Sequence, residues 1–125
     1  MARVLVTGGA GYIGSHAVRA LVDAGHAVAV LDNLSAGHAA ALPADVPLVQ
    51  ADMHDTAAVT RALTAHQAEA VMHFAAWLDV GASVRDPLGY YRNNVTGTLS
   101  VLAAMQQAGV RQFVFSSTFA VYGEP

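Results

Sequence analysis

Short apolar runs alternate along the chain with longer stretches in which apolar residues recur every three or four positions. The short runs, at residues 4–6, 27–31, 46–50, 70–74 and 113–116, are nearly continuous, as in strands buried on both faces. The longer stretches lie at residues 13–24, from residue 55 or 56 onward, and at residues 87–108. The pattern therefore predicts five strands, most of them followed by a helix.

The ends of the predicted helices carry residues that suit helix ends. Pro87 fits a first turn, where its missing N–H would have no partner, and Asp55 or Thr56 can cap the second helix. Gly25 and Gly109 fit the left-handed position that ends a helix. These signals support the predicted boundaries.

Each of the three predicted helices has an apolar face, and in the second helix it consists of Val59, Ala62 and Leu63. In the first helix, the residues expected to face the sheet are Ile13, Ala17, Ala20, Leu21 and Ala24, with Ser15 on the other face. In the helix at residues 87–108, four apolar residues share one stripe: Tyr91, Val95, Leu99 and Leu102.

The order of elements predicts an α/β fold of the Rossmann type, with a doubly wound parallel sheet. Right-handed crossovers give the five strands the spatial order 3-2-1-4-5. Pro47 favours an edge position for the third strand, because an edge tolerates its missing donor. Residues 1–125 contain no linker or low-complexity stretch, so we predict a single domain.

Composition excludes several classes of function. Hydrophobic residues make up 54% and charged residues 12%, which argues against disorder. No apolar run approaches the roughly 18 residues of a membrane span, and the first residues lack the regions of a signal peptide, so a cytoplasmic location is expected. The chain has no cysteine, and its six histidines are scattered, so no metal site is expected. The six basic residues, all arginine, form no nucleic-acid-binding stripe.

A glycine-rich loop joins the first strand to the first helix. Residues 7–14 are Thr-Gly-Gly-Ala-Gly-Tyr-Ile-Gly, and three of the glycines have separate tasks. Gly8 permits a tight turn, Gly11 lets a pyrophosphate approach the backbone, and Gly14 lets helix and strand pack closely. Free amides at the helix start favour an anion there. The loop therefore predicts a phosphate-binding site.

Asp32 ends the second strand, 18 residues after Gly14. Its carboxylate can accept hydrogen bonds from an adenosine ribose and would repel a 2′-phosphate, and no arginine is near it in the sequence. The pattern favours NAD over NADP as the cofactor. The alternative interpretation is a plain strand-to-helix turn beside a surface aspartate.

The spacing Gly-x-x-Gly-x-x-Gly, with threonine in front, resembles the extended short-chain dehydrogenase/reductase superfamily. Further segments resemble the UDP-glucose 4-epimerases within it: residues 11–16 (Gly-Tyr-Ile-Gly-Ser-His), 32–35 (Asp-Asn-Leu-Ser), 73–76 (His-Phe-Ala-Ala), 90–95 (Tyr-Tyr-Arg-Asn-Asn-Val) and 115–118 (Phe-Ser-Ser-Thr). The resemblance covers essentially the whole chain. It implies an NAD-binding domain of a nucleotide-sugar epimerase.

The resemblance also implies a role for residues along the path of the cofactor. Four residues would line the pyrophosphate, with Gly14 behind them: Gly8, Gly11, Tyr12 and Ile13. Asp32 and Asn33 would contact the adenosine ribose. Asp52 and Met53 would lie at the adenine, where the Asp52 carboxylate can accept from the exocyclic amine.

The nicotinamide end would be formed by the fourth and fifth strands and the long helix. Three residues would close over the cofactor: Phe74, Ala75 and Ala76. Asn93 would reach inward from the helix, and Ser116 and Ser117 would lie near the nicotinamide. Thr118 takes the place of the family's catalytic Ser or Thr, whose hydroxyl bonds the sugar.

Several of these residues also have plainer interpretations. Phe74 is typical of a core position on any strand, and His73 is more often a satisfied strand histidine than a catalytic base. Asn93 and Asn94 can be read as helix-surface residues, although adjacent asparagines disfavour a helix interior and so hint at a purpose.

The chemistry of the family needs a Tyr-x-x-x-Lys pair after the fifth strand, and the chain contains no lysine. In the family, the lysine and the cofactor lower the pKa of the tyrosine, which then takes a sugar hydroxyl proton as hydride moves to NAD. The C-terminal substrate domain of the family is not among these residues either. We therefore expect an incomplete Rossmann domain, ending after its fifth strand and inactive alone.

Four functions stay open from the sequence. The first is the cofactor half of an epimerase that interconverts UDP-glucose and UDP-galactose by transient hydride transfer to NAD, where the nucleotide sugar binds only when the C-terminal substrate domain is present. The second is an NAD-binding module without catalysis, and the third is the cofactor half of a related enzyme such as a nucleotide-sugar dehydratase. The fourth is a purely structural fragment whose site never fills. The helix at residues 87–108 resembles one that family members use to dimerise, and the fifth strand would leave an apolar edge, so a homo-oligomer is expected.

Overall fold

The computed structural model describes residues 1–34, 38–75 and 85–116. The elements in chain order are β1 (Arg3–Thr7), α1 (Tyr12–Asp23), β2 (Ala27–Asp32), η1 (Ala39–Ala41), β3 (Leu48–Gln50), α2 (Thr56–His66), β4 (Ala70–His73), α4 (Pro87–Tyr91), η2 (Arg92–Thr96), α5 (Gly97–Ala108) and β5 (Gln112–Phe115). Of these, η1 is a 3₁₀ helix and η2 is a π-helix. The predicted strands and helices are confirmed, with small shifts at their ends.

The five strands form one parallel sheet in the order β3-β2-β1-β4-β5, which confirms the predicted topology. Val4 on β1 lies opposite Val28 on β2 and Ala70 on β4, so all three strands run in register toward the same edge. Pro47 directly precedes the edge strand β3, and its carbonyl accepts from the Val30 amide at 2.9 Å. The carboxyl ends of the strands therefore converge, as a site at the switch point of the sheet requires.

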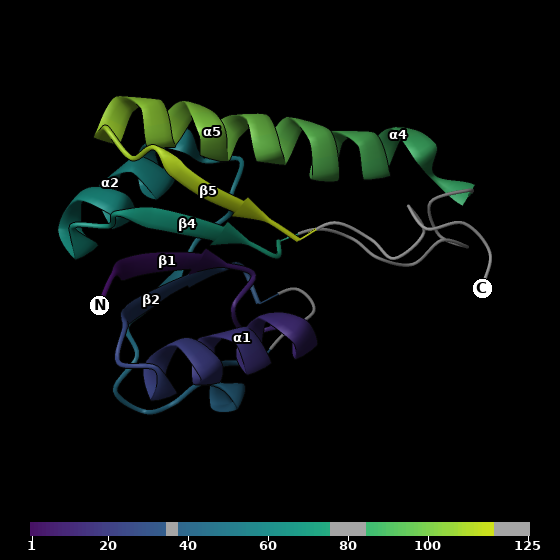
Figure 1. Ribbon diagram of the computed structural model, residues 1–125. Coiled ribbons are helices and arrows are strands. Elements are labelled where there is room, and N and C mark those ends of the chain that lie inside the picture. Colours follow the sequence, from purple (N-terminus) through teal and green to yellow (C-terminus); the bar gives the residue numbers. More distant parts are fainter. Residues whose placement is uncertain (35–37, 76–84, 117–125) are drawn as a thin grey trace, which may run out of the picture.

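Helices cover both faces of the sheet. Figure 1 shows α1 on one side, and α2 and α5 on the other. Alternate residues of the central strands enter two separate cores: Val6 packs on the α1 side, whereas Leu5 and Val71 pack on the side of α2 and α5. Burial on both faces explains why the strand sequences are continuously apolar and not alternating.

The face predicted for α1 is wrong at most positions, although the half-buried Leu21 does pack against the core. Ile13 is 53% exposed, whereas Gly14, Ser15 and Val18 are buried. The helix begins directly at the glycine loop, so its first turn lies against β1 and β2 and accepts only small side chains there. The Ser15 hydroxyl is satisfied in this position because it donates to the Tyr12 carbonyl at 3.0 Å.

The long helix predicted at residues 87–108 is one helical path made of α4, η2 and α5 (Figure 1). Pro87 occupies the first turn, the Asp86 carboxylate caps it by accepting from the Gly89 amide at 3.1 Å, and Gly109 ends it with φ of 76°. The π-helical segment falls on the two adjacent asparagines. π-turns inside helices are frequent at functional sites, which agrees with the purpose inferred for these asparagines.

The side chain of Tyr91, the first residue of the predicted apolar stripe, lies outside the described part of the chain, and the other three residues of the stripe face away from the sheet. Val95, Leu99 and Leu102 are exposed, and Leu99 is 60% exposed. The side that packs on α2 carries Val101 and Ala104, both fully buried. The stripe is therefore available for contact with another molecule.

Candidate cofactor site

The glycine loop packs directly against the end of β4. Gly8 has φ of +70°, and a Cβ on it would lie 2.6 Å from the Ala75 amide nitrogen and 2.7 Å from the Phe74 carbonyl carbon. The Gly8 amide donates to the Leu31 carbonyl at 2.8 Å. Glycine is therefore required here both by its conformation and by the close approach of β4. The contact brings the first and fourth strand ends together, as predicted.

Packing requires glycine at position 14 of the loop but not at position 11. A Cβ on Gly14 would overlap the Gly8 carbonyl oxygen, so Gly14 permits the helix to lie on the loop. A Cβ on Gly11 would meet only the Gly8 oxygen, at 3.4 Å, and Gly11 has φ of −75°. Folding alone does not require glycine at position 11, and its open side is the one a pyrophosphate would approach.

Gly9 has a packing role that the sequence reasoning missed. A Cβ on it would lie 2.8 Å from both γ-methyl carbons of Val30. The position is buried against β2. The sequence does contain a signal for this role, because Gly9 is the second glycine of a Gly-Gly pair next to a buried strand. The three-glycine pattern does not include this position.

The first turn of α1 presents backbone amides without a side-chain cap. Gly11 is the N-cap residue and has no side chain to accept from the turn. Amides in this turn have no partner within the helix, and the helix dipole adds positive charge there. Tyr12 is 81% exposed and its ring meets the ring of His16 edge-on at 4.9 Å, so Tyr12 and Ile13 offer a ligand mainly their amides.

Asp32 is buried and holds the loop in place. Only 8% of it is exposed, and its carboxylate accepts from the Ala10 amide at 3.0 Å and from the Leu34 amide at 2.7 Å. The interpretation as a surface aspartate is therefore wrong. Each carboxylate oxygen has a second lone pair, so ribose hydroxyls can still be accepted. Asn33, the other predicted ribose contact, is exposed directly after it.

Asp52 follows β3 and is paired with His54. The Asp52 Oδ1 atom accepts from the His54 amide at 2.8 Å and lies 2.6 Å from His54 Nδ1. The His54 amide, more than any other group, holds the pKa of Asp52 below its usual value. The side chain of Met53 is buried in the core against α5, so only its backbone is free to face an adenine.

A buried chain of hydrogen bonds runs from β1 to the long helix through His73. Thr98 Oγ1 donates to the Asn94 carbonyl at 2.6 Å, so this hydroxyl must accept from His73 Nε2 at 3.0 Å. His73 Nδ1 is then the acceptor for Thr7 Oγ1 at 2.5 Å. His73 is a neutral, fully bonded strand histidine, as the plainer interpretation held.

Burial lowers the pKa of His73 to about 4. The imidazole is 1% exposed, and the rings of Phe113 and Phe115 lie 5.8 and 5.9 Å from it. Charge on this ring would be costly in such surroundings. The histidine is therefore neutral at ordinary pH and acts here as a structural link, not as a base.

Of the other residues predicted at the nicotinamide end, Phe74, Ala75 and Ser116 follow strands, whereas Asn93 lies in η2. Phe74 and Ala75 follow β4, and Phe74 packs in part against the core on the α1 side. The Ser116 amide bonds the His73 carbonyl at 3.2 Å, and Asn93 Nδ2 donates to Asn94 Oδ1 at 2.9 Å. Three predicted residues lie outside the described residues: Ala76, Ser117 and Thr118.

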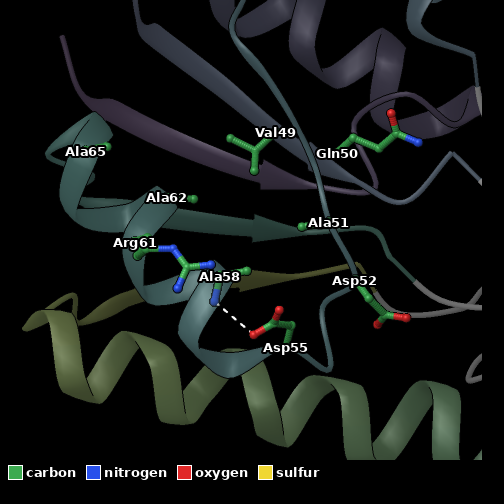
Figure 2. A pocket seen from close by; sticks show the side chains of 9 residues that line it. All are labelled: Val49, Gln50, Ala51, Asp52, Asp55, Ala58, Arg61, Ala62 and Ala65. Atoms are coloured by element: carbon green, nitrogen blue, oxygen red, sulfur yellow. Dashed lines mark hydrogen bonds between the residues drawn. The ribbon is translucent and has the colours of Figure 1, made fainter.

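An open hollow of about 500 Å³ lies between β3 and α2. Figure 2 shows Asp52 at one end and Ala65 at the other, with the Asp55 carboxylate bonded to the Ala58 amide. Of the residues that line it, only Asp52 belongs to the predicted site. The hollow therefore adjoins the predicted site without containing it.

Two structural findings concern other kinds of function. Across residues 1–34, 38–75 and 85–116, no helix has the length and apolar character needed to cross a membrane. Nor do any three histidine or acidic side chains in these ranges gather as ligands of a metal ion.

Comparison with known proteins assigns the chain to a family. The sequence profile of the family described as "NAD dependent epimerase/dehydratase family" matches residues 4–125. The chain belongs to this family. The fold, the glycine loop and the acid at the end of β2, which the residue pattern predicted, agree with this family.

Relatives within the family include UDP-glucose 4-epimerases. The enzyme of that name from Azospirillum brasilense is 53% identical over 123 residues, which is 98% of this chain and 35% of the relative. A Klebsiella pneumoniae protein of the same name is 46% identical over 129 residues, 98% of this chain and 93% of that sequence. The chain thus spans little over a third of the Azospirillum relative.

A solved structure agrees with the fold in detail. The UDP-glucose 4-epimerase from Brucella ovis, determined in complex with NAD, is 45% identical with a TM-score of 0.93. The match covers 100% of this chain and 38% of that protein.

Proposed function

We propose that this chain binds NAD in the crevice at the carboxyl ends of β1, β2 and β4, as the cofactor-binding part of a UDP-glucose 4-epimerase. The observation that carries the proposal is the glycine loop. It opens a helix with uncapped amides, packs against the end of β4, and is bonded to the buried acid that ends β2. The relatives named UDP-glucose 4-epimerase and the NAD complex of the Brucella protein support it.

The residues fit the adenosine and pyrophosphate parts of NAD. Amides of Tyr12 and Ile13, beside the open face of Gly11, would bind the pyrophosphate. Asp32 and Asn33 would accept from the ribose hydroxyls. Asp52 would accept from the adenine amine, next to the backbone of Met53.

The nicotinamide end is proposed from the family pattern. Phe74, Ala75 and Ala76 would close over the cofactor, with Asn93 reaching toward it. Ser116 and Ser117 would lie near the nicotinamide, and Thr118 would bond the sugar hydroxyl. The cytoplasmic location expected from the sequence stays a prediction.

When bound, NAD would supply a transient hydride acceptor for the interconversion of UDP-glucose and UDP-galactose. That reaction also needs the Tyr-x-x-x-Lys pair of the family, and the 125 residues contain no lysine. We propose cofactor binding as the part that these 125 residues take in that reaction. An assay of UDP-galactose conversion, with and without a C-terminal portion from a relative, separates a complementable enzyme half from a pure binding module.

Calorimetric titration tests the cofactor assignment. We expect NAD to bind and NADP to bind at least about tenfold more weakly, because the Asp32 carboxylate would repel the 2′-phosphate. Equal affinity for the two cofactors would contradict the role of Asp32. No heat at millimolar NAD would contradict the proposed function itself.

We also propose that the exposed stripe of α4, η2 and α5 forms a contact between two copies of the chain. Leu88, Val95, Leu99 and Leu102 are exposed along this helical path. β5 adds a second apolar surface, because Val114 and Phe115 are each 53% exposed. Large apolar side chains exposed in this way are typical of protein interfaces.

Sedimentation velocity tests the oligomer. We expect the native chain to sediment as a dimer or larger species at micromolar concentration, and a Leu99→Glu variant to shift toward monomer with unchanged helix content. Arg61→Glu, at an exposed position of α2, serves as a charge-changing control and should leave the assembly intact. A purely monomeric native chain would contradict this proposal.

A further inference from the structure

His54 has acceptors at both of its ring nitrogens. Nδ1 lies 2.6 Å from the Asp52 carboxylate, and Nε2 lies 2.9 Å from the Arg92 carbonyl oxygen. The carbonyl cannot donate a hydrogen bond, and an ionised carboxylate cannot donate either. Only the doubly protonated imidazolium has an N–H for each partner, whereas a neutral ring leaves one of the two contacts without a hydrogen.

The two partners belong to different parts of the proposed cofactor site. Asp52 would accept from the adenine. Arg92 is the first residue of the π-helix η2, which carries Asn93, the residue that would reach inward toward the cofactor. His54 therefore joins the loop after β3 to the π-turn, across 38 positions of sequence.

The start of α5 is packed closely against the same loop. A Cβ on Gly97 would lie 3.1 Å from His54 Nε2 and would overlap the end of the Met53 side chain. No side chain can stand between the π-turn and the loop at this point. The hydrogen bonds of His54 are therefore the polar part of a contact that is already sterically tight.

We propose that His54 is a positioning residue of the cofactor site, which in its doubly donating form fixes the Asp52 carboxylate and the π-turn relative to each other. The inference rests on the proposed NAD-binding function and assigns it a dependence on pH. Deprotonation would release one of the two contacts, so NAD would bind more weakly above the pKa of His54 than below it.

The charges around His54 agree with this form. Asp52 is the acid that faces the ring, and the bond to the Arg92 carbonyl, followed by the interactions with Asp52, raises the pKa of His54 above its ordinary value. Asp55 lies next to it on the chain but accepts from Ala58 as the cap of α2. The only charged side chain of η2 is that of Arg92, and α5 carries no titratable side chain.

The test measures NAD affinity against pH by calorimetry. For the native chain we expect the dissociation constant to be about three- to tenfold larger at pH 9 than at pH 6. His54→Gln, which cannot become a cation, should bind as weakly at pH 6 as at pH 9. His26→Gln, at the opposite end of β2, should keep the native profile.

A second measurement, on the unmodified chain, determines the coupling between His54 protonation and NAD binding directly. If protonated His54 favours NAD, then NAD must favour protonated His54 by an equal factor. NMR titration of the imidazole should therefore show its pKa rise by about 0.5 to 1 unit on saturation with NAD. A residue that merely stabilised the fold would not respond in this way.

The possible outcomes distinguish a failure of the positioning role of His54 from a failure of the proposed NAD-binding function. NAD binding with a flat pH profile, a native profile in His54→Gln, or an unchanged His54 pKa on NAD binding would each overturn the positioning role alone. Absence of NAD binding at pH 6 would overturn the proposed function, and this inference with it.

Discussion

A Gly14→Ala variant is expected to lose about 3 kcal/mol of unfolding free energy. The added Cβ would overlap the Gly8 carbonyl oxygen and lie 2.9 Å from the Gly9 Cα, and both are backbone atoms. Because backbone cannot rotate away as a side chain can, α1 would have to move off the loop. The loop would lose its shape together with the packing of the helix.

Gly11→Ala is the matched control for this variant. It adds the same methyl group to the same loop, but the nearest atom is 3.4 Å away and the backbone conformation suits alanine. Its unfolding free energy should stay within about 0.5 kcal/mol of the native value. Urea denaturation of the two variants and the native chain makes the comparison, and similar losses in both would contradict the geometry of the loop.

The second prediction with a large expected effect is a loss of stability in acid that is caused by the buried His73. Its pKa is 6.5 as an unperturbed group and about 4 in the folded chain. Above pH 6.5 neither the folded nor the unfolded histidine binds a proton, so the full stability is present. Between pH 6.5 and 4 only the unfolded chain binds the proton, and stability falls by an amount on the order of 3 kcal/mol.

Unfolding free energies at pH 7 and pH 4 measure this contribution. Other groups also titrate in this range, so the informative quantity is the difference in slope between the native chain and a His73→Gln variant. The native chain should lose on the order of 3 kcal/mol more than the variant does. His26→Gln, which changes a half-buried histidine far from this network, should keep the native slope. Parallel slopes for the native chain and His73→Gln would show that burial does not lower the pKa of His73.

The fold was predictable because its signals are local and repeated. Continuous apolar strands and helical spacing set the element order, and the handedness of crossovers then leaves few arrangements of a parallel sheet. The face of α1 was not predictable from periodicity. Its burial follows from where the glycine loop places the first turn, so small residues such as Gly14 and Ser15 face inward while Ile13 does not.

The geometry of the glycine loop was predictable where residue type and spacing determine it. Gly8, Gly14 and Asp32 lie where their types and spacing indicated, and Asp32 also anchors the loop. Contacts between distant positions gave no such signal. The Thr7–His73 bond spans 66 positions and the His54–Arg92 bond spans 38. The residues around each position do not indicate which distant residue it contacts.

Calorimetric titration of NAD into the native chain and into Gly11→Ala tests the proposed site most directly. In that site the pyrophosphate lies against the open side of Gly11, where a methyl group costs the free protein almost nothing. We expect NAD to bind the native chain and to bind the equally stable Gly11→Ala variant at least about thirtyfold more weakly, roughly 2 kcal/mol. Equal binding by the two proteins, or no binding by the native chain, would contradict the glycine loop as an NAD site.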